Sequence, residues 1–211
     1  MSKILIAAVL FLFLFSCKDA CKKEYDFSVS FNINPSLKDT FRIGDTLWLS
    51  SEIPFKFQDK RSSSYIDITN FNFQIQCNLG RLDTSVFTYP VNSFKYINSI
   101  GKLNIVNINN EISYFKVEHQ NEGTSKKLKV GLIPSKTGIY YLEFGYLTDN
   151  LNEAFNKVTL FDDKCVENFM INFDMNNSSD DFNFHLIKQS PQQITAFENY
   201  KRSGAYAFIV K

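Results

Sequence analysis

The sequence has none of the motifs, and few of the residues, that usually mark an enzyme. It contains no Gly-x-Ser-x-Gly, His-Glu-x-x-His, phosphate-loop or EF-hand pattern. Its only histidines are His119 and His185, and both positions fit a solvated or packed side chain. No Cys/His spacing suits zinc. The sequence therefore predicts a non-enzymatic protein with no catalytic residue, metal site or cofactor, and a hydrolase is the least favoured alternative.

Paired carboxylates are the remaining polar clusters. Asp162-Asp163 and Asp180-Asp181 lie in polar stretches that are typical of loops. Carboxylate oxygens can bind calcium, although an exposed loop carries the same residues without any ligand. A glycosidase pair would need a cleft of defined width, and the sequence indicates none.

An excess of one charge sign is also missing. The 211 residues include 23 Lys and Arg against 22 Asp and Glu, which gives a net charge of +1. Lys3 is the only charged residue among residues 1–16, so the rest of the chain has equal numbers of both signs. Nucleic acid requires a clustered basic surface, and we therefore expect no nucleic-acid partner.

No apolar run is long enough to cross a membrane. The longest, Ile4–Phe15, is shorter than the roughly 20 residues that a membrane-spanning helix needs. With Lys3 before it, the run instead fits the hydrophobic region of a cleaved export signal, which is about 7–15 residues long. We therefore assign residues 1–16 to a signal peptide.

The residues Leu14-Phe15-Ser16-Cys17 resemble the lipobox of bacterial lipoproteins, in which an aliphatic and a small residue precede a cysteine. The resemblance implies cleavage between Ser16 and Cys17 and attachment of diacylglycerol to the Cys17 sulfur. Phe15 departs from the pattern because it is bulkier than the usual residue there. Acyl chains anchor a protein durably, so membrane lipid held through Cys17 is the expected partner. The alternative is an ordinary cleaved signal that leaves Cys17 free.

Residues 17–26 are polar and of mixed charge, which predicts a tether between the membrane and a folded domain. They resemble the surface-export signals of Bacteroidota-type lipoproteins, although those signals are more uniformly acidic. The resemblance implies the outer membrane as the location and leaves both of its faces open. We expect a signal peptide (1–16), a tether (17–26) and one β-rich domain (27–211).

Cysteine is scarce, and its number is odd once Cys17 is set aside. Cys21, Cys77 and Cys165 remain in an oxidising compartment, so at most one disulfide can form within the chain. A Cys77–Cys165 bridge would close a long loop and stabilise the fold. The alternative is that Cys77 is a small apolar core residue.

Aromatic residues and a period of two are abundant. The chain has 22 Phe and 10 Tyr, which favour strands. Alternation of apolar and polar residues predicts strands over residues 27–33, 46–50, 71–77, 103–108, 112–118, 128–133, 139–147, 157–161, 167–175 and 205–210.

The connections follow from glycine, proline and asparagine. Gly80 is expected to end the strand at 71–77. Short turns are expected to join the strands at 112–118, 128–133 and 139–147 into an antiparallel meander. The best helix follows Ser190, over residues 192–202, with Gly204 just past its end.

The run Lys136-Thr137-Gly138-Ile139-Tyr140-Tyr141-Leu142 resembles the corner before the F strand of immunoglobulin-like domains. The resemblance implies that the Tyr140 hydroxyl bonds back to the turn backbone and that Leu142 replaces the usual cysteine. The fold class we expect is mainly β: an antiparallel, immunoglobulin-like β-sandwich with one short C-terminal helix.

Two residues in one short stretch have a possible external role. Asp45-Thr46-Leu47 resembles the O-glycosylation site of Bacteroidota exported proteins, which implies Thr46 as a candidate unless it is buried in a strand. Trp48, the only tryptophan, is interpreted as a packing residue of the core or of a sheet edge, with a ligand contact as the alternative.

The expected function follows from the anchor and from the missing motifs. We expect a membrane-anchored envelope lipoprotein that acts as a non-enzymatic binding or surface-interaction module. Its protein or glycan ligand would be held by loops or by an exposed strand edge. The alternative is a periplasm-facing structural or accessory lipoprotein of a membrane complex. A shallow aromatic patch on a polar surface would favour the binding module.

Overall fold

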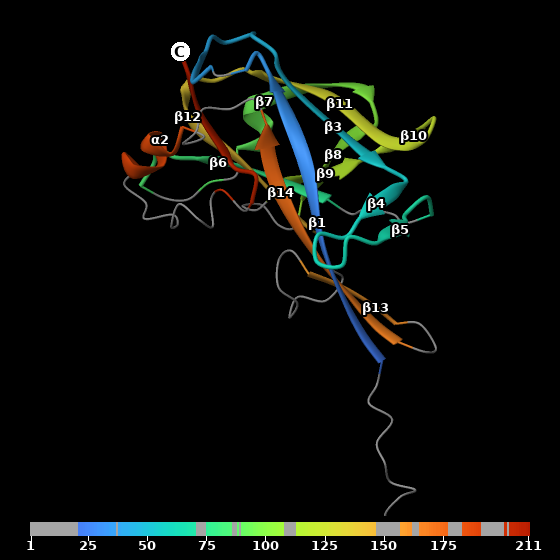
Figure 1. The fold of residues 1–211 in the computed structure, drawn as a ribbon. Coiled ribbons are helices and arrows are strands. Elements are labelled where there is room, and N and C mark those ends of the chain that lie inside the picture. The colour runs from blue at the N-terminus through green and yellow to red at the C-terminus, as the bar shows by residue number, and fades with distance from the viewer. Residues whose placement is uncertain are drawn as a thin grey trace, which may run out of the picture.

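The structure is a computed structural model, and it describes residues 21–36, 38–70, 75–85, 88, 90–107, 113–146, 157–161, 165–176, 183–190, 201 and 203–211. Two β-sheets pack face to face and a small hairpin lies beside them (Figure 1). Sheet A has the order β10 (Gln120–Glu122), β11 (Ser125–Pro134), β3 (Leu47–Pro54), β1 (Cys21–Asn34), β14 (Cys165–Asn176) and β13 (Lys157–Phe161), and β7 (Phe94–Ile100) also pairs with β11.

Sheet B has the order β2 (Thr40–Phe41), β15 (Tyr206–Val210), β12 (Gly138–Tyr146), β6 (Ile75–Arg81), β9 (Ser113–Glu118) and β8 (Lys102–Asn107). The small hairpin consists of β4 (Lys56–Gln58) and β5 (Tyr65–Asp67). Helical structure is confined, among the described elements, to a single turn, η1 (Val91–Ser93), and the short helix α2 (Phe184–Lys188). The immunoglobulin-like β-sandwich predicted from the sequence is confirmed. Its sheets are mixed, because β1 pairs with β14, and β2 with β15, in parallel.

Aromatic side chains fill the space between the sheets. Phe31 on β1 lies flat against Phe144 on β12, with ring centroids 3.8 Å apart and an interplanar angle of 9°. Phe173 on β14 approaches Phe144 at 6.2 Å. Phe31 and Phe173 lie on sheet A and Phe144 on sheet B, so the stack joins the two layers. The alternation of apolar and polar residues in the sequence therefore predicted correctly which face of β1 and of β14 points inward.

Helix α2 covers a second, smaller apolar cluster on the other face of sheet B. Phe184, Leu186 and Ile187 of α2 are buried with Tyr141 and Ala207. The sequence placed a helix later, at 192–202, and most of that range lies outside the described residues. Within it, Lys201 is helical. Gly204 has φ +59 and its N–H bonds to the Lys201 carbonyl at 3.1 Å, as a helix-ending glycine does.

Gly80 does not end its strand, contrary to the sequence-based expectation. It lies inside β6 opposite Tyr141 of β12. A Cβ atom at position 80 would come within 2.1 Å of the Tyr141 ring. The glycine is therefore needed because an aromatic ring crosses its backbone, and not because the chain turns there.

The expected meander is also wrong. Strands β9 and β12 belong to sheet B, and β11, which lies between them in sequence, belongs to sheet A. The chain changes sheets at His119, between β9 and β10, and at Gly101, between β7 and β8. A Cβ at Gly101, whose φ is +68, would lie 2.4 Å from the Glu118 carbonyl oxygen. A turn looks the same in sequence whether its strands pair with each other or cross between layers.

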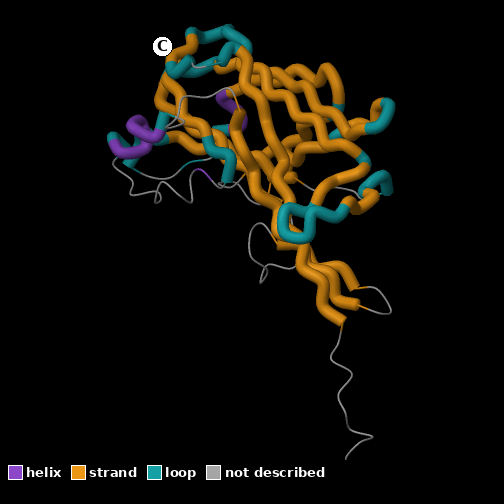
Figure 2. Tube along the Cα trace, in the orientation of Figure 1, coloured by secondary structure: helices purple, strands orange, loops and turns teal. Residues whose placement is uncertain are grey.

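The predicted tether is partly structured. Strand β1 begins at Cys21, so residues 21–26 of the expected tether pair with β14 along the register Cys21↔Cys165 to Asp26↔Met170. Strand β13 pairs with the same part of β14. These three strands project from the sandwich as a narrow ribbon, which we call the stalk (Figures 1 and 2). Backbone pairing does not require apolar side chains, and the partner strand is too distant in sequence to be inferred.

The stalk is attached to the sandwich at its upper end. Tyr25 packs against the core of the sandwich, and its ring stacks on that of Phe27, with ring centroids 6.1 Å apart. The Arg61 guanidinium lies 3.0 Å from the Glu24 carboxylate. Asp59 is 1% exposed, and its carboxylate accepts the Asp26 N–H at 2.7 Å. Burial alone would raise the pKa of Asp59, but N–H and O–H donors outweigh it and lower the pKa to about 2. This carboxylate therefore holds the loop after β4 against β1.

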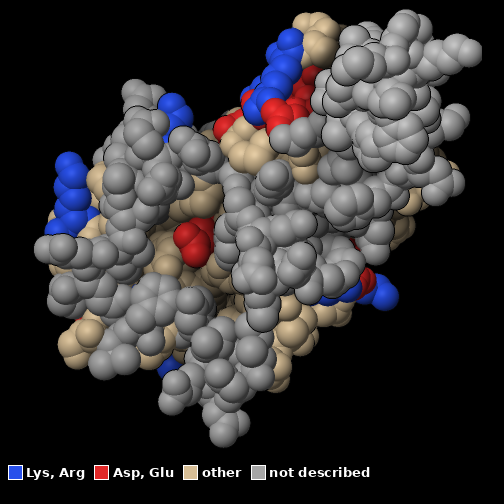
Figure 3. Space-filling view, turned by 90° about the horizontal axis from the view of Figure 1, so that it is seen from below, with Lys and Arg blue, Asp and Glu red and all other residues tan. Residues whose placement is uncertain are grey.

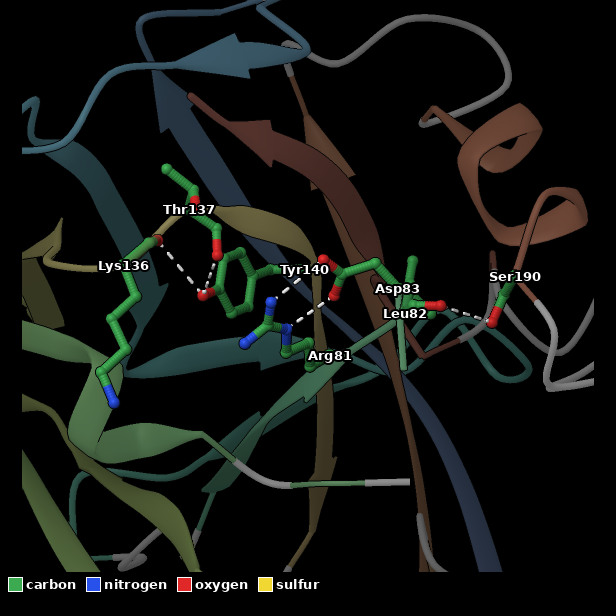
Figure 4. Close-up of polar contacts among 7 residues, drawn as sticks. All are labelled: Arg81, Leu82, Asp83, Lys136, Thr137, Tyr140 and Ser190. Carbon is green, nitrogen blue, oxygen red and sulfur yellow. Dashed lines mark hydrogen bonds and ion pairs between the residues drawn. The ribbon is translucent and has the colours of Figure 1, made fainter. Parts of the chain in front are cut away.

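The tyrosine corner expected from the immunoglobulin resemblance is present. The Tyr140 hydroxyl donates to the carbonyl oxygens of Lys136 and Thr137, each at 3.2 Å (Figure 4). Beside the ring, the Arg81 guanidinium forms a two-point ion pair with Asp83, at 2.6 and 3.1 Å. Burial raises the pKa of Tyr140, so the hydroxyl keeps its proton for these bonds.

Replacing Tyr140 by phenylalanine is expected to lower the free energy of unfolding by about 1–2 kcal/mol, because the carbonyl groups of the turn lose their donor inside the fold. Urea unfolding followed by tryptophan fluorescence measures the change. Tyr65, which is 65% exposed, provides the matched tyrosine-to-phenylalanine control and should change stability by less than about 0.5 kcal/mol. Equal effects at both positions would contradict the structural role of the corner.

Candidate functional site

An apolar strip crosses the outer face of sheet A. Trp48 of β3 is the register partner of Gly131 of β11, and Gly131 is the register partner of Ile97 of β7. Leu47 and Leu49, on either side of Trp48, are each 1% exposed and face the core. Trp48 therefore points outward, and its side chain is half-buried. We call Trp48, Gly131 and Ile97, together with Ile133 beside them, the Trp48 strip.

The glycine in the strip allows the indole to lie close to the sheet. A Cβ on Gly131 would come within 3.3 Å of two ring carbons of Trp48 and within 2.8 Å of the Thr46 methyl group. Gly131 is thus covered by these two side chains, although it lies on an outer face. An aromatic ring laid over a strand glycine fills the gap that a missing side chain would leave. The result is an apolar surface made of the indole ring, the Thr46 methyl group and the glycine that they cover.

The strip ends at an exposed edge strand. Among the described strands, β7 pairs only with β11, so its other edge has no strand partner. Ile97 is 39% exposed and Tyr96 is 40% exposed. Tyr96 faces sheet B, where its ring meets that of Phe115 edge-on with ring centroids 6.0 Å apart. An exposed edge with apolar side chains is a template for pairing with another chain.

Cationic side chains border the strip. The Lys129 ammonium lies 5.6 Å from the Trp48 ring centroid, and the lysine is exposed. Lys95, opposite Ile133 in the register, is also exposed. A cation over an indole face is a weak attraction at an exposed site, about 0.5–1 kcal/mol. Apolar groups with lysines around them are the composition of a contact surface for a partner with some negative charge.

The cysteine arrangement differs from the sequence-based prediction. Cys77 is a free, fully buried thiol in the middle of β6, and burial raises its pKa far above the usual value. The predicted Cys77–Cys165 bridge is therefore wrong, because Cys77 lies in the middle of β6, inside the sandwich, whereas Cys165 begins β14 at the outer end of the stalk, opposite Cys21. The alternative interpretation of Cys77 as a small core residue holds. Ser16 and Cys17 lie outside the described residues, so lipidation and cleavage there stay predictions.

The other residues singled out in the sequence do not form a chemical site. Thr46 is half-buried just before β3 and beside the strip, so its glycosylation stays a prediction. His185 is exposed on α2. Asp162-Asp163 and Asp180-Asp181 lie outside the described residues. Within the part of the chain that the structure describes, no group of three or more His, Cys, Asp or Glu side chains is arranged to hold a metal ion.

His119 lies at the corner where the chain changes sheets. Neither of its ring nitrogens has a hydrogen-bond partner among the described residues. Burial, with a contribution from the charge of Lys126, lowers the pKa of His119 to about 4. The imidazole is consequently neutral at physiological pH, and its ring lies 6.4 Å from that of Phe31. The residue as a whole is half-buried, but both ring nitrogens are buried, so His119 is a packing residue, which was one of the two interpretations of its sequence position.

The surface charge is mixed. On the face seen from below in Figure 3, coloured basic and acidic side chains lie close to one another, and the described residues there form no patch of one sign. No helix in the described part of the chain combines the length and apolar character needed to cross a membrane.

The strip was not predicted from the sequence, in which Trp48 was interpreted as a packing residue of the core or of a sheet edge. Its outward direction follows from Leu47 and Leu49 on either side, which the structure shows to be buried, because side chains alternate along a strand. The proximity of Gly131 and Ile97 could not be predicted, since both come from strands that lie far from Trp48 in sequence. The glycine gave no signal of its own, because an isolated glycine in a strand has several explanations.

Comparisons with known proteins give no family for this chain. No protein-family model matches the sequence, and no curated protein matches it significantly. Among solved structures, a type II cohesin dyad from the adaptor ScaA scaffoldin of Acetivibrio cellulolyticus aligns with TM-score 0.34 and 16% identity, over 70% of this chain and 46% of that one. The chain thus spans less than half the length of the cohesin dyad. The human F-spondin reeler domain aligns with TM-score 0.32 and 10% identity, over 74% of this chain and 98% of the domain.

Proposed function

We propose that the chain is an envelope lipoprotein, held in the outer membrane by lipid on Cys17, which binds a protein partner through the Trp48 strip and the adjoining edge of β7. The observation that carries the binding role is the outward-facing Trp48, laid over Gly131 and continued by Ile97 to an unpaired strand edge. The lipid anchor rests on the N-terminal sequence pattern.

A protein suits this surface better than a glycan. An edge strand offers a row of backbone donors and acceptors to an extended segment of another chain, and Ile97 and Trp48 offer apolar contacts beside it. Tryptophan is enriched among the residues that dominate binding energy at protein interfaces. Glycan recognition would be supported by several hydrogen-bonding side chains around the ring, whereas the register neighbours of Trp48 across this face are Gly131 and Ile97, with Lys129 beside the indole.

Crosslinking in intact cells tests the proposal. A photoreactive amino acid placed at Ile97 is expected to yield a covalent adduct with one envelope protein. Combining it with Trp48→Ala should reduce that adduct by about tenfold or more, as expected for loss of a dominant interface residue. Adducts are quantified on immunoblots and identified by mass spectrometry.

Two controls make the result specific. The same photoreactive residue at Tyr65, a more exposed position on β5 away from the strip, is expected to give no such adduct. Protease added to whole cells shows whether the adduct faces outward, as for a surface module, or the periplasm, as for an accessory lipoprotein. Equal adducts at Ile97 and Tyr65, or an adduct that survives Trp48→Ala, would refute binding through the strip. A Cys17→Ser chain that stays in the membrane fraction would refute the anchor.

A further inference from the structure

Two cysteines begin the two central strands of the stalk. Cys21 is the first residue of β1 and Cys165 is the first residue of β14. They are Cα partners at the end of the parallel ladder that joins these strands. The sequence separates them widely, and only the strand register brings them together.

The register meets the geometric requirement for a disulfide. Neighbouring strands lie about 4.8 Å apart, and disulfides join residues whose Cα atoms are roughly 4.4–6.8 Å apart. Register partners in a parallel ladder also share one face of the sheet. Because both cysteines lie at strand ends, small backbone adjustments there do not disturb the core.

Counting the cysteines that are available for a disulfide leads to the same pair. Cys77 is buried in sheet B as a free thiol, and the lipid on Cys17 would remove that sulfur from exchange. Cys21 and Cys165 are then the only two left, which resolves the odd number noted in the sequence.

A cross-link at the outer end of the stalk would also stabilise the pairing of β1 with β14. Strand β1 pairs with β3 only between Phe31 and Asn34. Between Cys21 and Asp26, the strand that pairs with β1 among the described residues is β14, and the loop after β4 contacts β1 only towards the sandwich, at Glu24 and Asp26, among the contacts of described residues. The outer end of β1 begins close to the expected lipid anchor at Cys17. A covalent bond at its first residue would stop β1 from separating from β14.

We infer that Cys21 and Cys165 form a disulfide that closes the outer end of the stalk. The two thiols lose two protons and two electrons as one S–S bond forms. A thiol–disulfide oxidoreductase of the envelope accepts them, and its own disulfide is reduced to two thiols. The oxidising compartment rests on the proposed export of the chain, whereas the pairing of the two cysteines does not.

Thiol labelling of the full chain tests the inference. The protein is extracted with detergent from whole cells, denatured without reductant and treated with a maleimide. Cys77 is expected to be labelled, while Cys21 and Cys165 stay unlabelled and appear as one linked peptide pair by mass spectrometry. After reduction, all three should be labelled. A second sample of the folded protein is equilibrated with oxidised and reduced glutathione before it is denatured and labelled. Labelling of Cys21 and Cys165 before reduction in both samples would overturn the inference.

The glutathione sample separates the bridge from the location. A bridge that forms with glutathione but is missing in the cellular sample supports the pairing and counts against export. A chain carrying both Cys21→Ser and Lys22→Cys is the matched control: its new cysteine pairs in register with Val166 and lies on the opposite face of the sheet from Cys165. We expect no linked peptide from it. An equally efficient bridge in this variant would show that the register does not determine the pairing.

Discussion

Phe144→Ala is expected to lower the free energy of unfolding by about 3–5 kcal/mol, the usual cost of truncating a buried phenylalanine. The Phe144 ring is 1% exposed and lies flat on Phe31 of the opposite sheet. Its removal would leave a cavity between the layers and would expose the Phe31 ring to that cavity. A typical domain has about 5–15 kcal/mol of stability in total, so the loss would be a large part of it.

Urea unfolding measured by the fluorescence of Trp48, the only tryptophan, gives the value. Trp48 lies on the outer face, so the substitution does not remove the probe's own contacts with sheet A. Tyr65→Ala, at a position that is 65% exposed, is the control and should change stability by less than about 0.5 kcal/mol. A loss below about 1.5 kcal/mol at Phe144 would mean that the stack does not hold the sheets together.

The second large effect is acid destabilisation through His119. Burial lowers the pKa of this imidazole from 6.5 to about 4 in the folded protein. Between these values the unfolded chain binds a proton that the folded chain does not, so the free energy of unfolding falls as the pH falls below about 6.5. The decrease is complete near pH 4 and amounts to about 3 kcal/mol, since one pKa unit corresponds to about 1.4 kcal/mol.

Comparison with a His119→Phe variant isolates this contribution, because the carboxylates titrate alike in both proteins. Urea unfolding at a series of pH values from 7 to 4 is expected to show a steeper loss of stability in the natural chain than in the variant. Parallel curves for the two proteins would contradict the burial of a neutral imidazole. The corner also contains Lys126, whose ammonium donates to the Thr69 carbonyl oxygen at 2.9 Å, and its pKa is itself lowered by burial.

Local pattern was sufficient for the strands and for one corner. Alternating residues predicted most strands, with the inward face of β1 and of β14 assigned correctly. The corner around Tyr140 was recognisable because its hydrogen bonds reach only to Lys136 and Thr137, three and four residues away. Features whose partners lie within one turn can be inferred from a short window of sequence.

Long-range pairing could not be inferred in the same way. The Cys77–Cys165 bridge was wrong because the sequence does not show that Cys165 begins the strand that runs beside β1 in the stalk, away from Cys77 in β6. Gly80 was mistaken for a strand end, since only the position of Tyr141 shows why a side chain is excluded there. The polar start of β1 resembled a free tether, because its stability comes from the backbone ladder with β14.

By itself, the sequence determined that the chain is β-rich and, through its alternation of apolar and polar residues, which face of most strands points inward. The tertiary structure decided that Trp48, Gly131 and Ile97 form one strip, and that Cys21 and Cys165 begin neighbouring strands. The reason is physical: side-chain direction repeats along each strand every two residues, whereas strand neighbours and register depend on the packing of segments far apart in sequence.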